Sequence, residues 1–157
     1  LKMKFLSILS LLALTSASLA CSCIEQTTKE AYCNAQWVSH VKINQRAIKH
    51  PMPWDVPSEM MGTVRYAVKH IQVFKMPVNL YQLPNAVYTP LESATCGITL
   101  NVGKEYLLAG RFAPRRTLNT ILCGQILPDP AENTFGIVIE WNQVPADLLT
   151  KIEKFKC

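Results

Sequence analysis

The stretch that decides the fold is Thr63-Val64-Arg65-Tyr66-Ala67-Val68-Lys69-His70-Ile71-Gln72-Val73-Phe74. Its first half, from Val64 to Val68, alternates apolar with polar or small residues, which is the period of a half-buried β-strand. The apolar parity then changes to Ile71 and Val73, and this change predicts a β-bulge inside the strand. Because a bulge bends and twists its strand, the pattern is typical of a small closed barrel.

Four further segments on either side of this stretch have the composition of strands, and a helical period closes the chain. The prolines of His50–Pro57 and of residues 75 to 95 predict connections between them. The sequence therefore predicts a mainly β fold, a five-stranded OB-like Greek-key barrel with a C-terminal helix. The additional strands are expected at Trp37–Ile48, Cys96–Val102, Glu105–Phe112 and Leu118–Leu127, and the helix at Pro145–Phe155.

Residues 1–20 have the layout of a secretion signal. Lys2 and Lys4 precede the apolar run Phe5–Leu14, and Ser18-Leu19-Ala20 offers small residues for a cut before Cys21. The run is shorter than the roughly 20 apolar residues that span a bilayer, so no membrane insertion is expected. We expect residues 21–157 to be one secreted, extracellular domain. A bacterial lipoprotein signal is the alternative, but it favours Leu where Ser18 stands.

Six cysteines lie after this segment: Cys21, Cys23, Cys33, Cys96, Cys123 and Cys157. An even number in a secreted chain predicts three disulfides, although spacing alone leaves 15 pairings open. Cys21 and Cys23 are too close in sequence to bond each other without strain, which favours pairing early cysteines with late ones.

Charge and motifs argue against several classes of function. Without Lys2 and Lys4 the formal net charge falls from +5 to +3, too small for a dedicated nucleic-acid binder. The three histidines, His40, His50 and His70, form no His-Glu-x-x-His array, and no Gly-x-Ser-x-Gly elbow is present. A Cys–His dyad would need a free thiol, and three disulfides among six cysteines leave none. Nothing here predicts an enzyme, and no catalytic residue is assigned.

The cysteine blocks carry a family resemblance. Cys21-Ser22-Cys23 followed by Tyr32-Cys33-Asn34-Ala35 resembles the mature amino terminus of the tissue inhibitors of metalloproteinases. The block Ser93–Gly110 is similar to the central strand block of that family, and Leu122-Cys123 and Cys157 match its later cysteines. The resemblance covers essentially the whole of residues 21–157. It implies a netrin-like inhibitory domain with the bridges Cys21–Cys96, Cys23–Cys123 and Cys33–Cys157. Vertebrate members carry a second, cysteine-rich domain, so a chain that stops at Cys157 is expected to be a single-domain member.

The resemblance also implies a function, the inhibition of secreted or membrane-anchored zinc metalloendopeptidases of the matrix metalloprotease type. After signal removal, the amine and carbonyl of Cys21 would chelate the target enzyme's catalytic zinc and displace its water. The chain would need no cofactor of its own. Ser22 would face the S1′ pocket, the specificity pocket just past the cleaved bond. The expected protease-binding residues are Cys21, Ser22, Cys23, Ile24 and Glu25 together with Glu92, Ser93, Ala94, Thr95 and Cys96.

A different class of function stays open beside inhibition. The fold that the resemblance implies is also used for extracellular binding, so the chain could be a netrin-type module for matrix polyanions or growth factors. Arg111, Arg115 and Arg116 surround Pro114 and would form the basic patch for a heparin-like polyanion.

Overall fold

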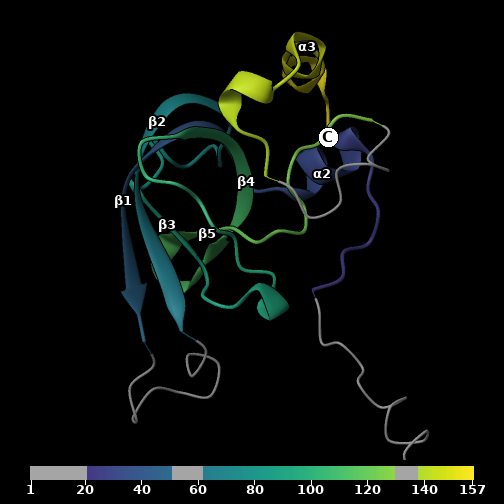
Figure 1. Ribbon diagram of the computed structural model, residues 1–157. Coiled ribbons are helices and arrows are strands. Elements are labelled where there is room, and N and C mark those ends of the chain that lie inside the picture. The colour runs from purple at the N-terminus through teal and green to yellow at the C-terminus, as the bar shows by residue number, and fades with distance from the viewer. Residues whose placement is uncertain (1–20, 51–61, 130–137) are drawn as a thin grey trace, which may run out of the picture.

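The computed structural model describes residues 21–50, 62–129 and 138–157. The predicted signal, residues 1–20, and most of the proline-rich segment His50–Pro57 lie outside these ranges. Five strands close into a barrel in the order β1-β2-β3-β5-β4, and β1 pairs with β4 (Figure 1). The prediction of a mainly β, five-stranded OB-like barrel with a C-terminal helix is confirmed.

All strand pairs of the barrel are antiparallel except β3 and β5, which run parallel. The strands are β1 Trp37–Lys49, β2 Thr63–Lys75, β3 Ala86–Pro90, β4 Glu105–Ala113 and β5 Thr117–Asn119. The helices are α2 Thr28–Asn34 and α3 Ala146–Lys154, and three short 3-10 turns are η2 Ser93–Thr95, η3 Pro114–Arg116 and η5 Trp141–Gln143.

The bulge predicted in the deciding stretch is present. His40 pairs with Gln72 and the next residue, Val41, pairs with His70, so Ile71 is the extra residue of β2. The side chains of Ile71 and Val73 do not enter the core, because Ile71 is 46% exposed and Val73 is 38% exposed. The change of parity therefore marked the bend of the strand and not a second buried face.

The predicted strand Cys96–Val102 is wrong. Its alternation is real, since Ile98 and Leu100 are both buried, but the segment pairs with no strand. Its amides donate to side-chain hydroxyls instead: Ile98 N to Thr89 Oγ1 at 3.0 Å and Leu100 N to the Tyr66 hydroxyl at 3.0 Å. These bonds satisfy buried amides without a ladder, which sequence periodicity cannot distinguish from strand pairing.

The predicted strand Leu118–Leu127 is also mostly wrong, because β5 ends at Asn119. Beyond it, Gln125 takes over the hydrogen bonds that a strand would make. Its side chain accepts from Ala109 N at 3.2 Å and donates to Ala109 O and Ile121 O at 3.1 and 2.6 Å. The missing barrel strand is β3, which lies inside the predicted connection 75 to 95.

A second hydrophobic cluster joins the helices to the outside of the barrel. Tyr32 of α2, Leu148 and Ile152 of α3, and Leu107 of β4 are all buried in it. Figure 1 shows α2 and α3 gathered at one side of the barrel. The helix α2, which the sequence analysis did not predict, begins with a capping box between Thr27 and Glu30. Within the described ranges, no helix combines the length and the apolar character that crossing a bilayer requires.

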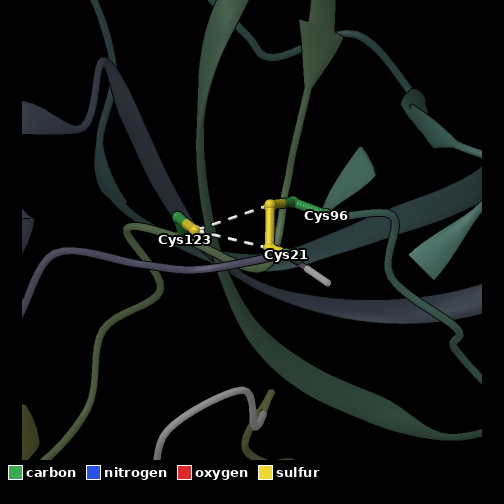
Figure 2. Close-up of side chains that lie close together, drawn as sticks. All are labelled: Cys21, Cys96 and Cys123. Atoms are coloured by element: carbon green, nitrogen blue, oxygen red, sulfur yellow. Dashed lines mark hydrogen bonds between the residues drawn. A yellow bond between two sulfur atoms is a disulfide. The ribbon is translucent and has the colours of Figure 1, made fainter. Parts of the chain in front are cut away.

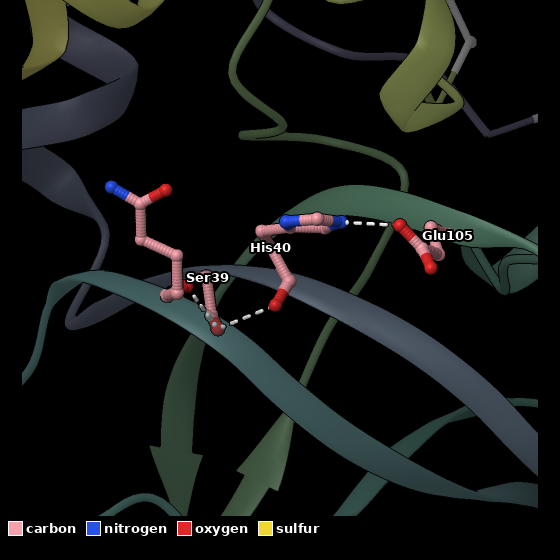
Figure 3. A network of polar contacts seen from close by, with 4 residues as sticks. Ser39, His40 and Glu105 are labelled. Atoms are coloured by element: carbon pink, nitrogen blue, oxygen red, sulfur yellow. Dashed lines mark hydrogen bonds and ion pairs between the residues drawn. The ribbon is translucent and has the colours of Figure 1, made fainter.

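The strand histidines serve packing. His40 is buried, its Nε2 lies 2.8 Å from Glu105 Oε2 (Figure 3), and its ring stacks on Trp141 with centroids 3.6 Å apart. His70 Nε2 donates to Pro84 O at 3.0 Å, and Nδ1 lies 2.9 Å from Ser39 Oγ. Burial lowers the pKa of His70 below its ordinary value. Both rings therefore hold neighbouring segments against the barrel.

Candidate functional site

The predicted site residues form two strips that a disulfide joins. We name Cys21–Glu25 the N-terminal strip, Glu92–Cys96 the second strip, and the two together the ridge. The Cys21–Cys96 bond links them with a Cα–Cα distance of 5.0 Å. The structure thus brings together segments that are 75 residues apart in sequence. Their contact with a protease stays a prediction.

Two further disulfides fix the start of the chain. Cys23 bonds Cys123, and Cys33 of α2 bonds Cys157, with Cα–Cα distances of 5.3 and 5.4 Å. These are the three pairs that the family resemblance implies, and they use all six cysteines. Each bond joins one of the early cysteines to a late one. The N-terminal strip is therefore attached to the body of the fold at Cys21 and Cys23.

Three sulfur atoms meet at the centre of the ridge. Cys123 Sγ lies 3.7 Å from Cys21 Sγ and 3.7 Å from Cys96 Sγ, as the dashed lines of Figure 2 indicate. Each sulfur belongs to a disulfide and carries no hydrogen, so these are packing contacts. For the same reason the three sulfurs offer no thiolate to a metal ion, although they lie close enough together to surround one. The contact packs one disulfide against the other.

Attachment at alternate residues turns the remaining side chains outward. Ser22 is exposed and Ile24 is 87% exposed, whereas Cys21 and Cys23 are half-buried. Behind the strip, Thr28 fixes the chain by donating its amide to Asp129 Oδ1 at 2.9 Å and its hydroxyl to Leu127 O at 2.6 Å. The side chains of Ser22 and Ile24 therefore face solvent beside the Cys21–Cys96 bond.

A tight turn shapes the second strip. The carbonyl of Glu92 accepts from Thr95 N, Thr95 Oγ1 and Gly97 N at 3.1, 2.8 and 3.1 Å. Cys96 has a left-handed backbone with φ of 63°. Gly97 has no room for a side chain, because a Cβ there would overlap the carbonyl oxygen of Pro90. This geometry holds Glu92, Ser93 and Ala94 exposed beside the disulfide.

The structure adds a segment that the sequence analysis had not assigned to the site. Leu122 N donates to Cys96 O at 2.9 Å, and Cys123 then packs its sulfur against the Cys21–Cys96 bond. The residues Ile121–Gly124 consequently border the ridge. The pairing of Cys123 with Cys23 was the signal that could have placed them there.

The basic residues of the alternative function lie on β4 and on the turn that follows it. Arg111, Arg115 and Arg116 are all exposed. Arg115 and Arg116 both have left-handed backbones, with φ of 65° and 59°. Two adjacent non-glycine residues in this region carry strain, since the Cβ atom disfavours it. None of the three forms an ion pair with another described residue.

Comparison with known proteins identifies the family. The family model described as "Tissue inhibitor of metalloproteinase" matches residues 19–129, a span that contains both strips and the bordering segment. The chain belongs to the tissue inhibitor of metalloproteinase family. The predicted family is thereby confirmed, and it is a family of enzyme inhibitors, not of enzymes.

Relatives within the tissue inhibitor of metalloproteinase family fall into two groups by length. The chain is 44% identical over 153 residues to "Putative metalloproteinase inhibitor tag-225" of Caenorhabditis elegans, which covers 97% of each protein. It is 32% identical over 126 residues to "Metalloproteinase inhibitor 2" of Homo sapiens, and 31% over 112 residues to that of Bos taurus. These alignments cover 78% and 69% of this chain but 55% and 49% of the mammalian proteins. The chain thus spans about half the length of its mammalian relatives.

Proposed function

We propose that the protein inhibits zinc metalloendopeptidases of the matrix metalloprotease type through the ridge, with Cys21 as the group that reaches the target's zinc. The observation that supports this most is the double attachment of the N-terminal strip. Cys21 is bonded to Cys96, and Cys23, two residues further along, is bonded to Cys123. The family membership supports inhibition as the activity, and the ridge supplies the means.

The chemistry follows from what a catalytic zinc needs. Such a zinc has three protein ligands and a fourth position where water is activated. If residues 1–20 are removed as a secretion signal, Cys21 begins the mature protein with an α-amine next to its own carbonyl. The pKa of an α-amine is about 7.7 to 8.0, so a neutral amine with a free lone pair is accessible near neutral pH. Amine and carbonyl together form a five-membered chelate that replaces the water.

Rigidity makes this chelation effective. A free chain end would lose conformational entropy on binding, whereas a strip bonded at Cys21 and Cys23 has lost most of it already. Ser22 and Ile24 then face away from the body of the protein and are available to the enzyme's substrate groove. Because the Ser22 side chain is small, it leaves a deep S1′ pocket largely unfilled. We therefore expect moderate affinity for many metalloproteases.

The test is a protein with one extra alanine before Cys21, compared with the protein that begins at Cys21. The extra residue turns the amine into an amide and moves the new amine away from the zinc. We expect inhibition of a matrix metalloprotease catalytic domain to disappear while the melting temperature is unchanged. Full inhibition by the extended protein would refute zinc chelation by Cys21. Amino-terminal sequencing of secreted protein tests the cut itself, and a start other than Cys21 would refute the domain boundary and the mechanism together.

A second function is supported by the strained basic turn. We propose that Arg111, Arg115 and Arg116 bind a heparin-like polyanion, because strained backbones persist where a function requires them. The triple alanine variant should elute from heparin at lower salt than the unaltered protein, since fewer counterions are released. Equal elution would refute this function and leave the ridge proposal untouched.

A further inference from the structure

A pocket of about 340 Å³ lies between α2 and the ends of β4 and β5. Its volume falls in the range of about 300 to 1,000 Å³ that is typical of ligand sites. Cys123 contributes to its wall, so the pocket adjoins the ridge without including the second strip. Four polar residues line it, Gln26, Asn34, Arg111 and Asn119, together with apolar ones that include Ala31, Ala35 and Ile121.

Two of the lining residues each carry a buried side-chain oxygen that has no hydrogen-bond donor. Gln26 Oε1 and Asn119 Oδ1 are buried and unpartnered, and no other side-chain nitrogen or oxygen in the described part of the chain is in that state. Buried acceptors are almost always paired, because leaving one unpaired costs its full desolvation. The two residues come from different elements, the segment before α2 and the strand β5, yet both line one pocket. A ligand with N–H donors would satisfy both.

A positive charge stands beside these acceptors. Arg111 and Asn119 are direct cross-strand partners in the pairing of β4 with β5. Directly opposite residues have Cβ atoms about 4.5 to 5.5 Å apart on the same face of the sheet. The Arg111 side chain is exposed and forms no ion pair with a described residue. Its guanidinium can therefore receive a carboxylate in two parallel hydrogen bonds.

One common chemical group carries a carboxylate, an adjacent N–H and an apolar side chain, and that is the last residue of a polypeptide. We propose that this pocket binds the C-terminus of a polypeptide that ends in an apolar residue. The terminal carboxylate pairs with Arg111, and the last two amide N–H groups donate to Asn119 Oδ1 and Gln26 Oε1. The terminal side chain packs on Ala31, Ala35 and Ile121 of the lining. The terminal torsions of Gln and Asn side chains are broad, so a small rotation brings each oxygen to the ligand.

The experiment is a titration of the ¹⁵N-labelled whole protein with acetyl-Gly-Leu, followed by NMR. The matched probe is acetyl-Gly-Leu amide, which keeps both N–H donors and the leucine but lacks the charge. Since a ligand of this size reaches millimolar affinity, both are titrated to about 10 mM. We expect saturable shifts of the Gln26 and Asn119 side-chain NH₂ signals with the acid, and about tenfold weaker binding of the amide, because charge-assisted hydrogen bonds are the stronger ones. No saturable shift, or equal affinity of acid and amide, would overturn the proposal.

Variants separate the site from a general anion effect. Asn119→Leu and Gln26→Met keep the size of the side chain and remove the acceptor, and each should weaken acetyl-Gly-Leu binding severalfold. Arg111→Gln should weaken it about tenfold, whereas Arg115→Gln, which removes the same charge outside the pocket, should not. If Arg115→Gln weakens binding as much as Arg111→Gln, the probe is held by charge alone and the proposal fails. The proposal does not rest on protease inhibition, and a failure of either leaves the other standing.

Discussion

Removing the Cys23–Cys123 disulfide should strongly weaken inhibition, while removing Cys33–Cys157 should not, although both changes destabilise the fold to a similar degree. Both bonds attach the same early segment of the chain. Only the Cys23–Cys123 bond lies at the ridge, where Cys123 Sγ packs on the Cys21–Cys96 bond. The second joins α2 to the end that follows α3. The pair of variants therefore separates rigidity of the ridge from stability of the whole domain.

The expected loss of stability follows from the loops that each bond closes while the other two are intact. With Cys21–Cys96 intact, the Cys23–Cys123 bond closes a loop of about 29 residues. With Cys23–Cys123 intact, the Cys33–Cys157 bond closes a loop of about 44 residues. The chain-entropy model then gives about 3.6 and about 4.0 kcal/mol. For a domain of this size either change should lower the melting temperature by about 10 to 15 °C.

The expected loss of affinity follows from the residues that become mobile. Freeing the N-terminal strip at Cys23 restores the backbone freedom of about two residues, at about 1 to 2 kcal/mol each. A loss of about 2 to 4 kcal/mol corresponds to an inhibition constant about 30 to 900 times higher. Because the Cys33–Cys157 bond contains no ridge residue, its removal should change the inhibition constant less than about threefold.

The assay uses the two Cys→Ala pairs, each made with Cys21 as the verified first residue. Urea unfolding followed by circular dichroism gives the stabilities. Titration of a matrix metalloprotease catalytic domain, well below both melting temperatures, gives the inhibition constants. Equal losses of affinity in the two variants would refute the argument that the ridge acts through its rigidity, as would unchanged affinity without Cys23–Cys123.

Two further predictions follow from single residues. Gly97→Ala should destabilise the protein by about 1 to 3 kcal/mol and weaken inhibition, because the new Cβ displaces the carbonyl of Pro90 and with it the second strip. The control Gly103→Ala has open space around the new Cβ, so it should affect stability through its left-handed backbone but leave inhibition intact. Similar inhibition by both variants would contradict this prediction. Burial lowers the pKa of His70, so the unfolded chain takes up that proton first as the pH falls. The free energy of unfolding should therefore decrease below about pH 6.5, by at most about 1.4 kcal/mol per pH unit from this group. Urea unfolding at several pH values measures this dependence, and His70→Asn should make it less steep. An equally steep decrease in the variant would rule out His70 as the cause.

Hydrophobic periodicity in the sequence predicted the limits of the long strands and of the C-terminal helix. The limits of β1, β2 and β4 agree with the predicted segments within one or two residues, as do those of α3, because apolar alternation and helical spacing are local properties. The bulge at Ile71 could also be predicted, since an extra residue must change the parity of the side chains. The α2 helix had a readable signal, the capping box from Thr27 to Glu30, that was not used.

Prediction failed where side chains take the place of backbone partners. Alternation from Cys96 to Val102 indicated a strand, but Tyr66 and Thr89 supply the hydrogen bonds from other strands. Gln125 does the same after β5. Tyr66 lies 34 residues before Leu100 and Ala109 lies 16 residues before Gln125, so the alternation within each segment does not reveal these partners. The strand β3 ends at Pro90, and prolines in residues 75 to 95 predicted a connection there. The strand is recognised only by its pairing with β2 and β5.

The sequence by itself determined the barrel class through strand periodicity, and the family through the resemblance of its cysteine blocks, because both patterns are local properties of the chain. Only the tertiary structure decided which atoms meet. It placed the Cys123 sulfur against the Cys21–Cys96 bond, turned Ile24 outward, and gathered two unpaired amide oxygens around one pocket. The physical reason is that a disulfide, a hydrogen bond or a cavity wall depends on distances between residues that lie up to 124 positions apart in sequence. The closure of the chain sets these distances, and local propensity does not.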